Sequence, residues 1–320
     1  MYKAEFQLTT DCNMNCVFCF NKGQDSRELE KSVVFEQIND GIQRGLEYVW
    51  LTGGEALLDF EKAREIILYC KKLGVKTGLS TNGMLLPKYI SKLEKAGLDS
   101  VRVSLDSVSK KNFEEQRGGC FETVLQGIRL AGISNMQTII RVTVSVHNVD
   151  EVPEIIGLSG SLGADSVEVK PVLPVGKADF AIMPTPQKFY EVFQRATNGQ
   201  YNIPVTCVCN FLPECKDYYV KPNVECQCSH SAIYIAASGE IMPCSYFPSE
   251  NRFNAYSDFI STAWDSDFFE RVVNTKPEKC SLCSRWESCR NGCPAVLHHY
   301  GCLGEEFFEF VRGISNGMFE

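Results

Sequence analysis

The sequence lacks the features that would place it in a membrane, on a secretory route or on nucleic acid. No apolar run approaches the ~20 residues that a bilayer-spanning helix needs, and the N-terminal MYKAEFQLTT has no long apolar signal-peptide core. Positive charge is in the minority, with 32 Lys and Arg against 40 Asp and Glu and a net charge of −8. Binding to a phosphate backbone requires clustered basic residues. We therefore expect a cytoplasmic protein with no membrane or nucleic-acid partner.

Cysteine, in contrast, is abundant. The chain has 16 cysteines among 320 residues, whereas its hydrophobic content of 44% and charged content of 22% are those of an ordinary globular protein. A chain of this length buries enough surface to fold without disulfides. In a reducing compartment, many cysteines indicate metal or redox chemistry rather than structural disulfides.

Apolar runs alternate with amphipathic stretches over residues 1–200. The apolar runs predict six strands, at 4–8, 48–51, 76–79, 100–105, 138–146 and 166–172. The amphipathic stretches predict six helices, at 32–44, 61–72, 87–96, 121–131, 150–162 and 186–197. This alternation indicates a parallel α/β sheet or an incomplete barrel, in which ligands bind at the C-terminal ends of the strands.

The region after residue 200 has a different character. Eleven of the 16 cysteines fall between Cys207 and Cys302, and the strand–helix alternation stops. The predicted elements are a hairpin, with strands at 232–237 and 240–244, and one helix at 263–273. We expect a second, cysteine-rich domain over residues 201–320, whose small core depends on metal sites.

The loop after the first predicted strand contains Cys12, Cys16 and Cys19 in the spacing C-x3-C-x2-C. Three thiolates this close together can hold one metal centre. A [4Fe–4S] cluster has four irons, so three cysteines leave one iron free to bind a substrate or cofactor. The alternative is a structural zinc site with a remote fourth ligand.

This loop, with Phe18 before its last cysteine, resembles the signature of radical S-adenosylmethionine (radical SAM) enzymes. The resemblance extends across the first domain and implies a partial (β/α)6 TIM-like barrel. It also implies a [4Fe–4S] cluster whose open iron binds S-adenosylmethionine. One electron would then cleave this cofactor to methionine and a 5′-deoxyadenosyl radical, which abstracts hydrogen from an unactivated C–H bond.

The resemblance also assigns residues to S-adenosylmethionine. The run Thr52-Gly53-Gly54-Glu55 is similar to the family's GGE turn, whose backbone and glutamate would hold the methionine amino group. Hydroxyl residues after the third and fourth strands would meet the ribose and methionine parts, although such residues are also common helix N-caps. An arginine would lie near the methionine carboxylate, and a leucine backbone near adenine. The cofactor-binding residues implied are Phe18, Gly53, Gly54, Glu55, Thr81, Ser104, Arg117 and Leu173.

A second cysteine pattern occupies the C-terminal region. It resembles the seven-cysteine SPASM extension of radical SAM enzymes, which carries two auxiliary [4Fe–4S] clusters, and this makes three clusters in all. A zinc ribbon is the alternative interpretation. One implied auxiliary cluster has the ligands Cys280, Cys283, Cys289 and Cys302. The other implied cluster has the ligands Cys228, Cys244 and Cys293.

The fourth ligand of this last cluster stays open. Cys226 is nearest, but a C-x-C pair must reach two irons of one cube over a short tether. The more distant candidates are Cys207, Cys209 and Cys215. A vacant iron would let substrate bind the cluster directly. Cys70 and Cys120 are expected to be ordinary buried residues.

Enzymes with the SPASM extension mostly modify peptides. The resemblance therefore favours an oxidative maturase of a ribosomally made peptide, with the auxiliary clusters accepting an electron. The first alternative is a small-molecule substrate, such as a tetrapyrrole side chain or an aminoglycoside-like alcohol. The second is an iron–sulfur electron-transfer protein that does not cleave S-adenosylmethionine. The implied partners are the substrate and an electron donor of the flavodoxin or ferredoxin type.

Three features narrow the choice within this resemblance. Ser245 follows Cys244 where anaerobic sulfatase maturases have an aspartate base, which disfavours that activity. Trp50 stands where the molybdenum-cofactor GTP cyclase has an arginine, which disfavours the cyclase activity. The cluster loop begins at residue 12, so a leader peptide would be read by the barrel, the second domain or a separate protein.

Overall fold

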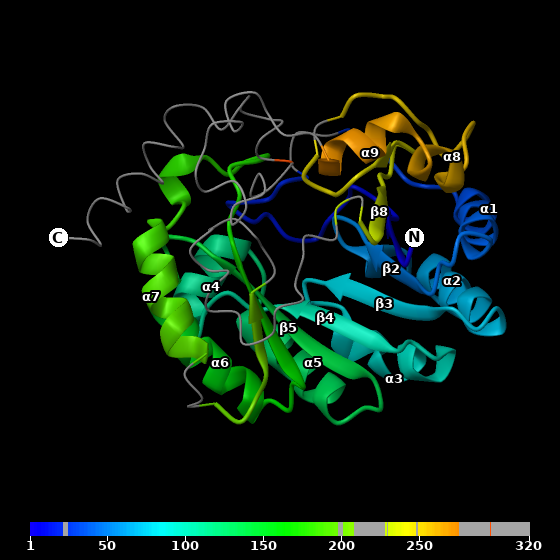
Figure 1. Cartoon of the computed structure of the whole chain (residues 1–320). Helices are drawn as coiled ribbons and strands as arrows, with labels where there is room; N and C mark the ends of the chain where they lie inside the picture. The colour runs from blue at the N-terminus through cyan, green and yellow to red at the C-terminus, as the bar shows by residue number, and fades with distance from the viewer. Residues whose placement is uncertain are drawn as a thin grey trace, which may run out of the picture.

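The computed structural model of the chain describes residues 1–21, 25–197, 201–207, 228, 230–247, 249–274 and 295. Within these residues, strands and helices alternate along the chain (Figure 1). No helix in the described part of the chain is long and apolar enough to cross a membrane.

One sheet contains all the strands of the described residues. Seven of them lie side by side in chain order and in parallel: β1 (Lys3–Gln7), β2 (Tyr48–Thr52), β3 (Lys76–Thr81), β4 (Ser100–Ser104), β5 (Gln137–Val144), β6 (Ser166–Pro171) and β7 (Val205–Cys207). On the other side of β1, β8 (Ala232–Ile235) pairs in parallel, and β9 (Ile241–Met242) pairs antiparallel with β8. Over the described residues the sheet ends at β7 and β9, so it is the partial barrel that the sequence predicts and it does not close.

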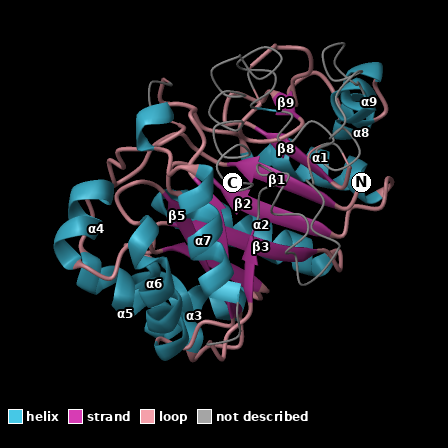
Figure 2. Ribbon diagram, turned by 60° about the vertical axis from the view of Figure 1, so that its left-hand side comes forward, coloured by secondary structure: helices cyan, strands magenta, loops and turns pink. Residues whose placement is uncertain are grey.

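Helices cover the outer face of this sheet (Figure 2). They are α1 (Lys31–Ile42), α2 (Phe60–Lys72), α3 (Leu86–Ala96), α4 (Lys110–Arg117), α5 (Phe121–Gly132), α6 (Val152–Ser161) and α7 (Pro186–Thr197). Short 3-10 turns add η1 (Ala56–Asp59), η2 (Val149–Glu151) and η3 (Phe180–Ile182). Two further helices follow the hairpin, α8 (Ile260–Trp264) and α9 (Asp267–Asn274), and α8 packs against α1.

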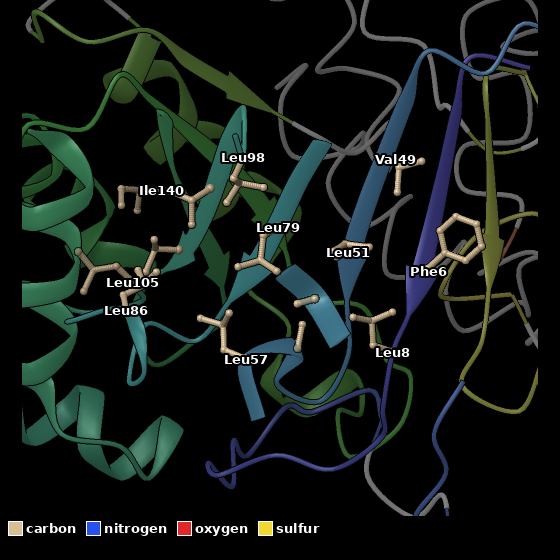
Figure 3. Close-up of a cluster of buried hydrophobic side chains, with 14 of the residues drawn as sticks. Phe6, Leu8, Val49, Leu51, Leu57, Leu79, Leu86, Leu98, Leu105 and Ile140 are labelled. Carbon is tan, nitrogen blue, oxygen red and sulfur yellow. The ribbon is translucent and has the colours of Figure 1, made fainter. Parts of the chain in front are cut away.

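The two faces of the sheet differ in polarity. Outward-facing Phe6, Leu51, Leu79 and Ile140 are fully buried and belong to the apolar core between sheet and helices (Figure 3). The alternate, inward-facing positions are mostly polar, such as Arg102 in β4. Strands of a parallel sheet are usually apolar on both faces, so this alternation marks the inner face as a surface for binding.

The strands and helices predicted before residue 200 are all present, with ends shifted by a few residues. The sequence prediction missed α4, whose residues KKNFEEQR include one apolar side chain, Phe113, and so show no helical periodicity. Local capping and the buried side chains of Phe113, Gln116 and Arg117 hold it instead. Ser109 Oγ accepts from Asn112 N (3.4 Å), and Gly118, with a φ of +71°, ends the helix.

The hairpin after residue 230 is confirmed, but the single helix predicted at 263–273 is wrong. Two helices occupy this stretch, because the first helix ends at Trp264 and a second one begins at Asp267. Ser266 lies at the break, where its hydroxyl donates to Ala263 O (2.6 Å) and accepts from Phe269 N (3.4 Å). A serine that caps a new helix in this way competes with continuation of the old one.

Candidate active site

A loop of residues 9–19 follows β1 at the C-terminal edge of the sheet. Main-chain hydrogen bonds fix it in two places. Gly54 N donates to Thr9 O (2.7 Å), which joins the loop to the turn after β2. Asn15 N donates to Arg117 O (3.1 Å), which joins it to the last residue of α4. The surrounding fold therefore fixes the backbone that carries the three cysteines.

The thiols of this loop lie among N–H donors. Cys12 is exposed, and Cys16 and Cys19 are half-buried. Met14 N and Asn82 Nδ2 lie 3.4 Å and 3.6 Å from Cys12 Sγ. Desolvation by the surrounding protein raises the pKa of the Cys12 and Cys16 thiols, because it penalises the charged thiolate. Three thiols with N–H groups aimed at sulfur fit an iron–sulfur cluster, which binds thiolates and is tuned by such hydrogen bonds.

The turn after β2 packs against the loop with no room for a side chain. A Cβ on Gly54 would lie 2.2 Å from Asp11 O. The next residue, Glu55, is 1% exposed, and its carboxylate accepts from Thr81 Oγ1 (2.9 Å) and Asn82 N (2.8 Å). Burial raises the pKa of Glu55, and the Asn82 N–H opposes this shift. The glutamate side chain therefore braces the ends of β2 and β3, whereas the glycine backbone lines the cavity described below.

Arg117 forms a buried ion pair with Asp106, which follows β4. Asp106 Oδ1 also accepts from Thr143 N (2.6 Å), so the acid is held from two sides. Arg117 Nη1 lies 3.7 Å from Cys16 Sγ, and its Cζ lies 5.3 Å from the centre of the Phe18 ring. The arginine implied by the family resemblance is thus already paired with an acid and directs one N–H at a sulfur of the loop.

The loop, the turn and the inner face of the sheet enclose a cavity of about 820 Å³. The three cysteines of the loop line it. Seven of the residues that the resemblance assigned to S-adenosylmethionine also line it: Phe18, Gly53, Gly54, Thr81, Ser104, Arg117 and Leu173. The fold therefore brings together, around one space, residues from the first strand to the sixth.

Two cysteines of the C-terminal region reach the same cavity. Cys228 is buried, and its backbone pairs with Ala232 at the start of β8 in an isolated β-bridge. Cys244 is half-buried and lies just after β9. Cys207 ends β7. The other predicted ligands lie outside the described residues: Cys226, Cys280, Cys283, Cys289, Cys293 and Cys302, with the alternatives Cys209 and Cys215. The two auxiliary clusters therefore stay a prediction. Of the cysteines expected to be buried, Cys70 is, but Cys120 is exposed.

A largely charged group lines the inner face of the sheet, and none of its members except Trp50 was singled out from the sequence. Trp50 comes from β2, Arg102 from β4, Arg141 from β5, and Glu168 and Lys170 from β6. The sequence does contain a pattern that indicates these residues. These residues occupy alternate positions of strands predicted to be parallel, where aliphatic residues are the rule on both faces. We call these residues, together with Lys3 and Glu5 of β1, the cavity floor.

Glu168 is the centre of the cavity floor. Its Oε2 accepts from Arg141 Nε (2.8 Å), and its Oε1 accepts from Arg102 Nη2 (3.2 Å). Burial alone would raise the pKa of Glu168, but Arg141 and Arg102 outweigh it and lower the pKa to about 2. Arg102 Cζ also lies 4.0 Å from the centre of the Trp50 ring, a cation–π contact. The floor is therefore charged at neutral pH.

Comparison with known sequences identifies relatives of this arrangement. Residues 6–158 match the sequence model of the radical SAM superfamily. AdoMet-dependent heme synthase of Methanosarcina barkeri is 25% identical over 317 residues, which cover 91% of this chain and 90% of that protein. A probable GTP 3',8-cyclase of Sulfurisphaera tokodaii is 32% identical over 174 residues, 53% of this chain and 55% of that protein. The chain thus matches about half the length of that cyclase.

Comparison with solved structures shows the same fold. SuiB of Streptococcus suis, bound to S-adenosylmethionine, superposes with a TM-score of 0.77 and 19% identity over 92% of this chain and 73% of that one. The enzyme anSMEcpe with bound AdoMet superposes with a TM-score of 0.73 and 16% identity over 99% of this chain and 95% of that one. At these identities the likeness is one of architecture.

Proposed function

Because the chain belongs, through residues 6–158, to the radical SAM superfamily, we propose that it oxidises a C–H position of a substrate held in the cavity. Cys12, Cys16 and Cys19 would hold a [4Fe–4S] cluster, and the cavity that they line would take S-adenosylmethionine. Together these groups supply, when bound, a one-electron route to hydrogen abstraction from an unactivated carbon. The observation that carries the proposal is the junction of the three-cysteine loop, the Gly53–Gly54 turn and one cavity.

The protein's own residues bind and orient the cofactor, and they exclude water from the site. In this proposal the backbone of Gly53 and Gly54, which lines the cavity, receives the methionine part of the cofactor. Hydroxyl groups of Thr81 and Ser104 and the backbone of Leu173 contact the remainder. The N–H of Arg117 aimed at Cys16 favours the thiolate that a cluster requires. A lined cavity keeps bulk water from a reactive centre.

The C-terminal cysteines complete the oxidation in this proposal. Loss of a hydrogen atom followed by loss of one electron and one proton leaves the substrate oxidised by two electrons. Cys228 and Cys244 would help to hold an auxiliary cluster, which would supply an acceptor for the second electron. This role is supported by the position of both residues on the wall of the same cavity, because short distances favour electron transfer.

The substrate that we propose is a ribosomally made peptide. The fold is shared with SuiB, one of whose structures is bound to the precursor peptide SuiA, and with anSMEcpe, which has been solved with a Cp18Cys peptide. The test is to incubate reduced enzyme and S-adenosylmethionine with a short peptide encoded beside its gene. We expect 5′-deoxyadenosine and a peptide lighter by two hydrogen atoms. Deoxyadenosine formation with an unchanged peptide contradicts the peptide assignment.

A second candidate substrate is a tetrapyrrole side chain. The match to the Methanosarcina barkeri heme synthase favours it, since this match extends over 91% of the chain rather than over the barrel alone. The same assay separates the candidates when a porphyrin carboxylic acid replaces the peptide and its mass is followed. A fully cluster-loaded protein that forms no deoxyadenosine with either substrate would favour either obligatory triggering by another substrate or the alternative of an iron–sulfur electron-transfer protein.

A further inference from the structure

The cavity floor has more positive than negative charge. Its two acids are Glu5 and Glu168. Its four cations are Lys3, Arg102, Arg141 and Lys170. The whole chain, in contrast, has a net charge of −8. An excess of cations inside an acidic protein does not follow from its composition and needs a local explanation.

Internal pairing accounts for only part of this charge. Lys3 Nζ lies 3.5 Å from Glu5 Oε2, so this pair is internally balanced. Glu168 is shared between Arg102 and Arg141, so one carboxylate faces two guanidinium groups. Arg102 Nε lies 2.7 Å from a Glu168 oxygen, yet its N–H makes no hydrogen bond within the described residues. One guanidinium charge on the floor therefore lacks its own anion.

Lys170 adds a second unbalanced cation. Its side chain is 8% exposed, and its ammonium lies 3.5 Å from the centre of the Tyr246 ring in the loop after β9. No carboxylate of the described residues forms an ion pair with it. A buried cation without an anionic partner is costly, and a ring face offsets only part of that cost.

From this imbalance we infer that the cavity floor binds a carboxylate of the substrate, received by Arg102, Arg141 and Lys170. The inference deepens the proposed function and rests on it. A planar guanidinium fork matches the geometry of a carboxylate, and a lysine adds a point charge beside it. Because these three side chains are mostly buried, each of these contacts is stronger than it would be at the surface.

The floor is well placed to orient a substrate. Arg102 lies two residues before Ser104 on β4, roughly 7 Å deeper in the cavity at the rise of an extended strand. Ser104 lies at the end of the strand, toward the cysteine loop. Arg141 pairs in register with Ser104, and Lys170 pairs with Thr143, so the three cations extend from the depth of Arg102 toward the cofactor end. A carboxylate held among them therefore places carbons a few bonds away at the cofactor end. The carboxylate has two possible sources, an acidic residue of a peptide or a small organic acid such as a porphyrin propionate.

The experiment measures binding by unreduced, cluster-loaded enzyme with S-adenosylmethionine, using calorimetry and two matched pairs of probes. One pair is the blocked tripeptide Ala-Glu-Ala and its Ala-Gln-Ala counterpart. The other is mesoporphyrin and its dimethyl ester. We expect at least one acid to bind about tenfold or more tightly than its neutral counterpart, and the pair that does so identifies the source. Absent binding of both acids, or equal binding within both pairs, overturns the inference.

Variants test whether the preference for the acid depends on the cavity floor. Lys170→Gln should weaken binding of the acid about tenfold and leave the neutral probe unchanged, and Lys170→Arg should restore it. Lys111→Gln, on the exposed face of α4, is the matched control and should have no effect. Unchanged acid binding by Lys170→Gln contradicts the inference.

A second variant should change the affinity for the acid in the opposite direction. A gain in affinity cannot be caused by a folding defect, so this variant keeps the test decisive. Glu168→Gln removes the internal competitor and frees both guanidinium groups, so the acid should bind about tenfold more tightly. A floor with a purely structural role predicts lower stability with no gain in affinity, and that result overturns the inference. These measurements need no turnover. Failure of deoxyadenosine formation in the same preparations would count against the proposed function alone.

Discussion

Cys16 connects the cysteine loop to the barrel, because Arg117 Nη1 lies 3.7 Å from its sulfur. Replacing it with alanine removes one of three thiols, so the proposed cluster would lose a ligand and the N–H contact to that ligand together. We expect Cys16→Ala to reduce dithionite-driven 5′-deoxyadenosine formation to background. Cys120→Ala is the matched control, since Cys120 is an exposed thiol outside the loop. Retained deoxyadenosine in the Cys16 variant would show that the cluster lies elsewhere.

Glu168 makes the stability of the protein depend on acid pH. Its folded-state pKa of about 2 lies below the ordinary value of 4.5. The stabilisation is therefore fully present above pH ~4.5 and is lost as the pH falls toward the folded pKa. Between pH ~6 and pH ~3.5 we expect the wild type to lose about 1 kcal/mol more unfolding free energy than Glu168→Gln, measured by urea titration. Parallel losses in both proteins would contradict this assignment.

At the scale of elements, the turn between β2 and η1 must approach the cysteine loop closely. A methyl group on Gly54 would lie 2.2 Å from Asp11 O, so Gly54→Ala forces the two segments apart. We expect this variant to lose about 1–3 kcal/mol of unfolding free energy and to cleave S-adenosylmethionine at least ~10-fold more slowly.

Gly157 provides the control for this prediction. It lies on the exposed side of α6, where an added methyl group would meet nothing within 4 Å. Gly157→Ala should therefore gain about 0.5–1 kcal/mol, because alanine favours the helix. Equal effects of the two substitutions, measured by urea unfolding and deoxyadenosine formation, would show that the close approach at Gly54 has no special role.

The elements that the sequence predicts well are those with strong periodicity. The helix at 186–197 has the predicted bounds because apolar residues such as Phe189 and Val192 repeat on one face. The failures have local causes. In α4, only Phe113 is apolar and the capping of Ser109 defines the helix, whereas Ser266 divides a continuous apolar pattern into two helices. Capping contacts of one side chain are weak signals in sequence and decisive in structure.

At the scale of the whole molecule, spacing along the chain predicts the site where motifs are local and fails where residues meet only through the fold. The three cysteines and Gly54 were found because each motif is contiguous. The cavity floor was not, since Arg102 and Glu168 lie on strands separated by β5 and pair only across the sheet. The pairing of β8 with β1 is likewise long-range and has no local signature.

The number of clusters is a property of the whole chain and is the measurement that we would make first. Cys228 and Cys244 reach the cavity that the cysteine loop lines, as expected if the C-terminal region holds clusters near the substrate. We therefore predict about 12 irons per chain after anaerobic reconstitution, for three four-iron clusters, together with deoxyadenosine formation. About four irons with deoxyadenosine would mean that the C-terminal cysteines bind another metal or none. The oxidation would then need an external electron acceptor, because the cavity would have no cluster other than the one that reduces S-adenosylmethionine.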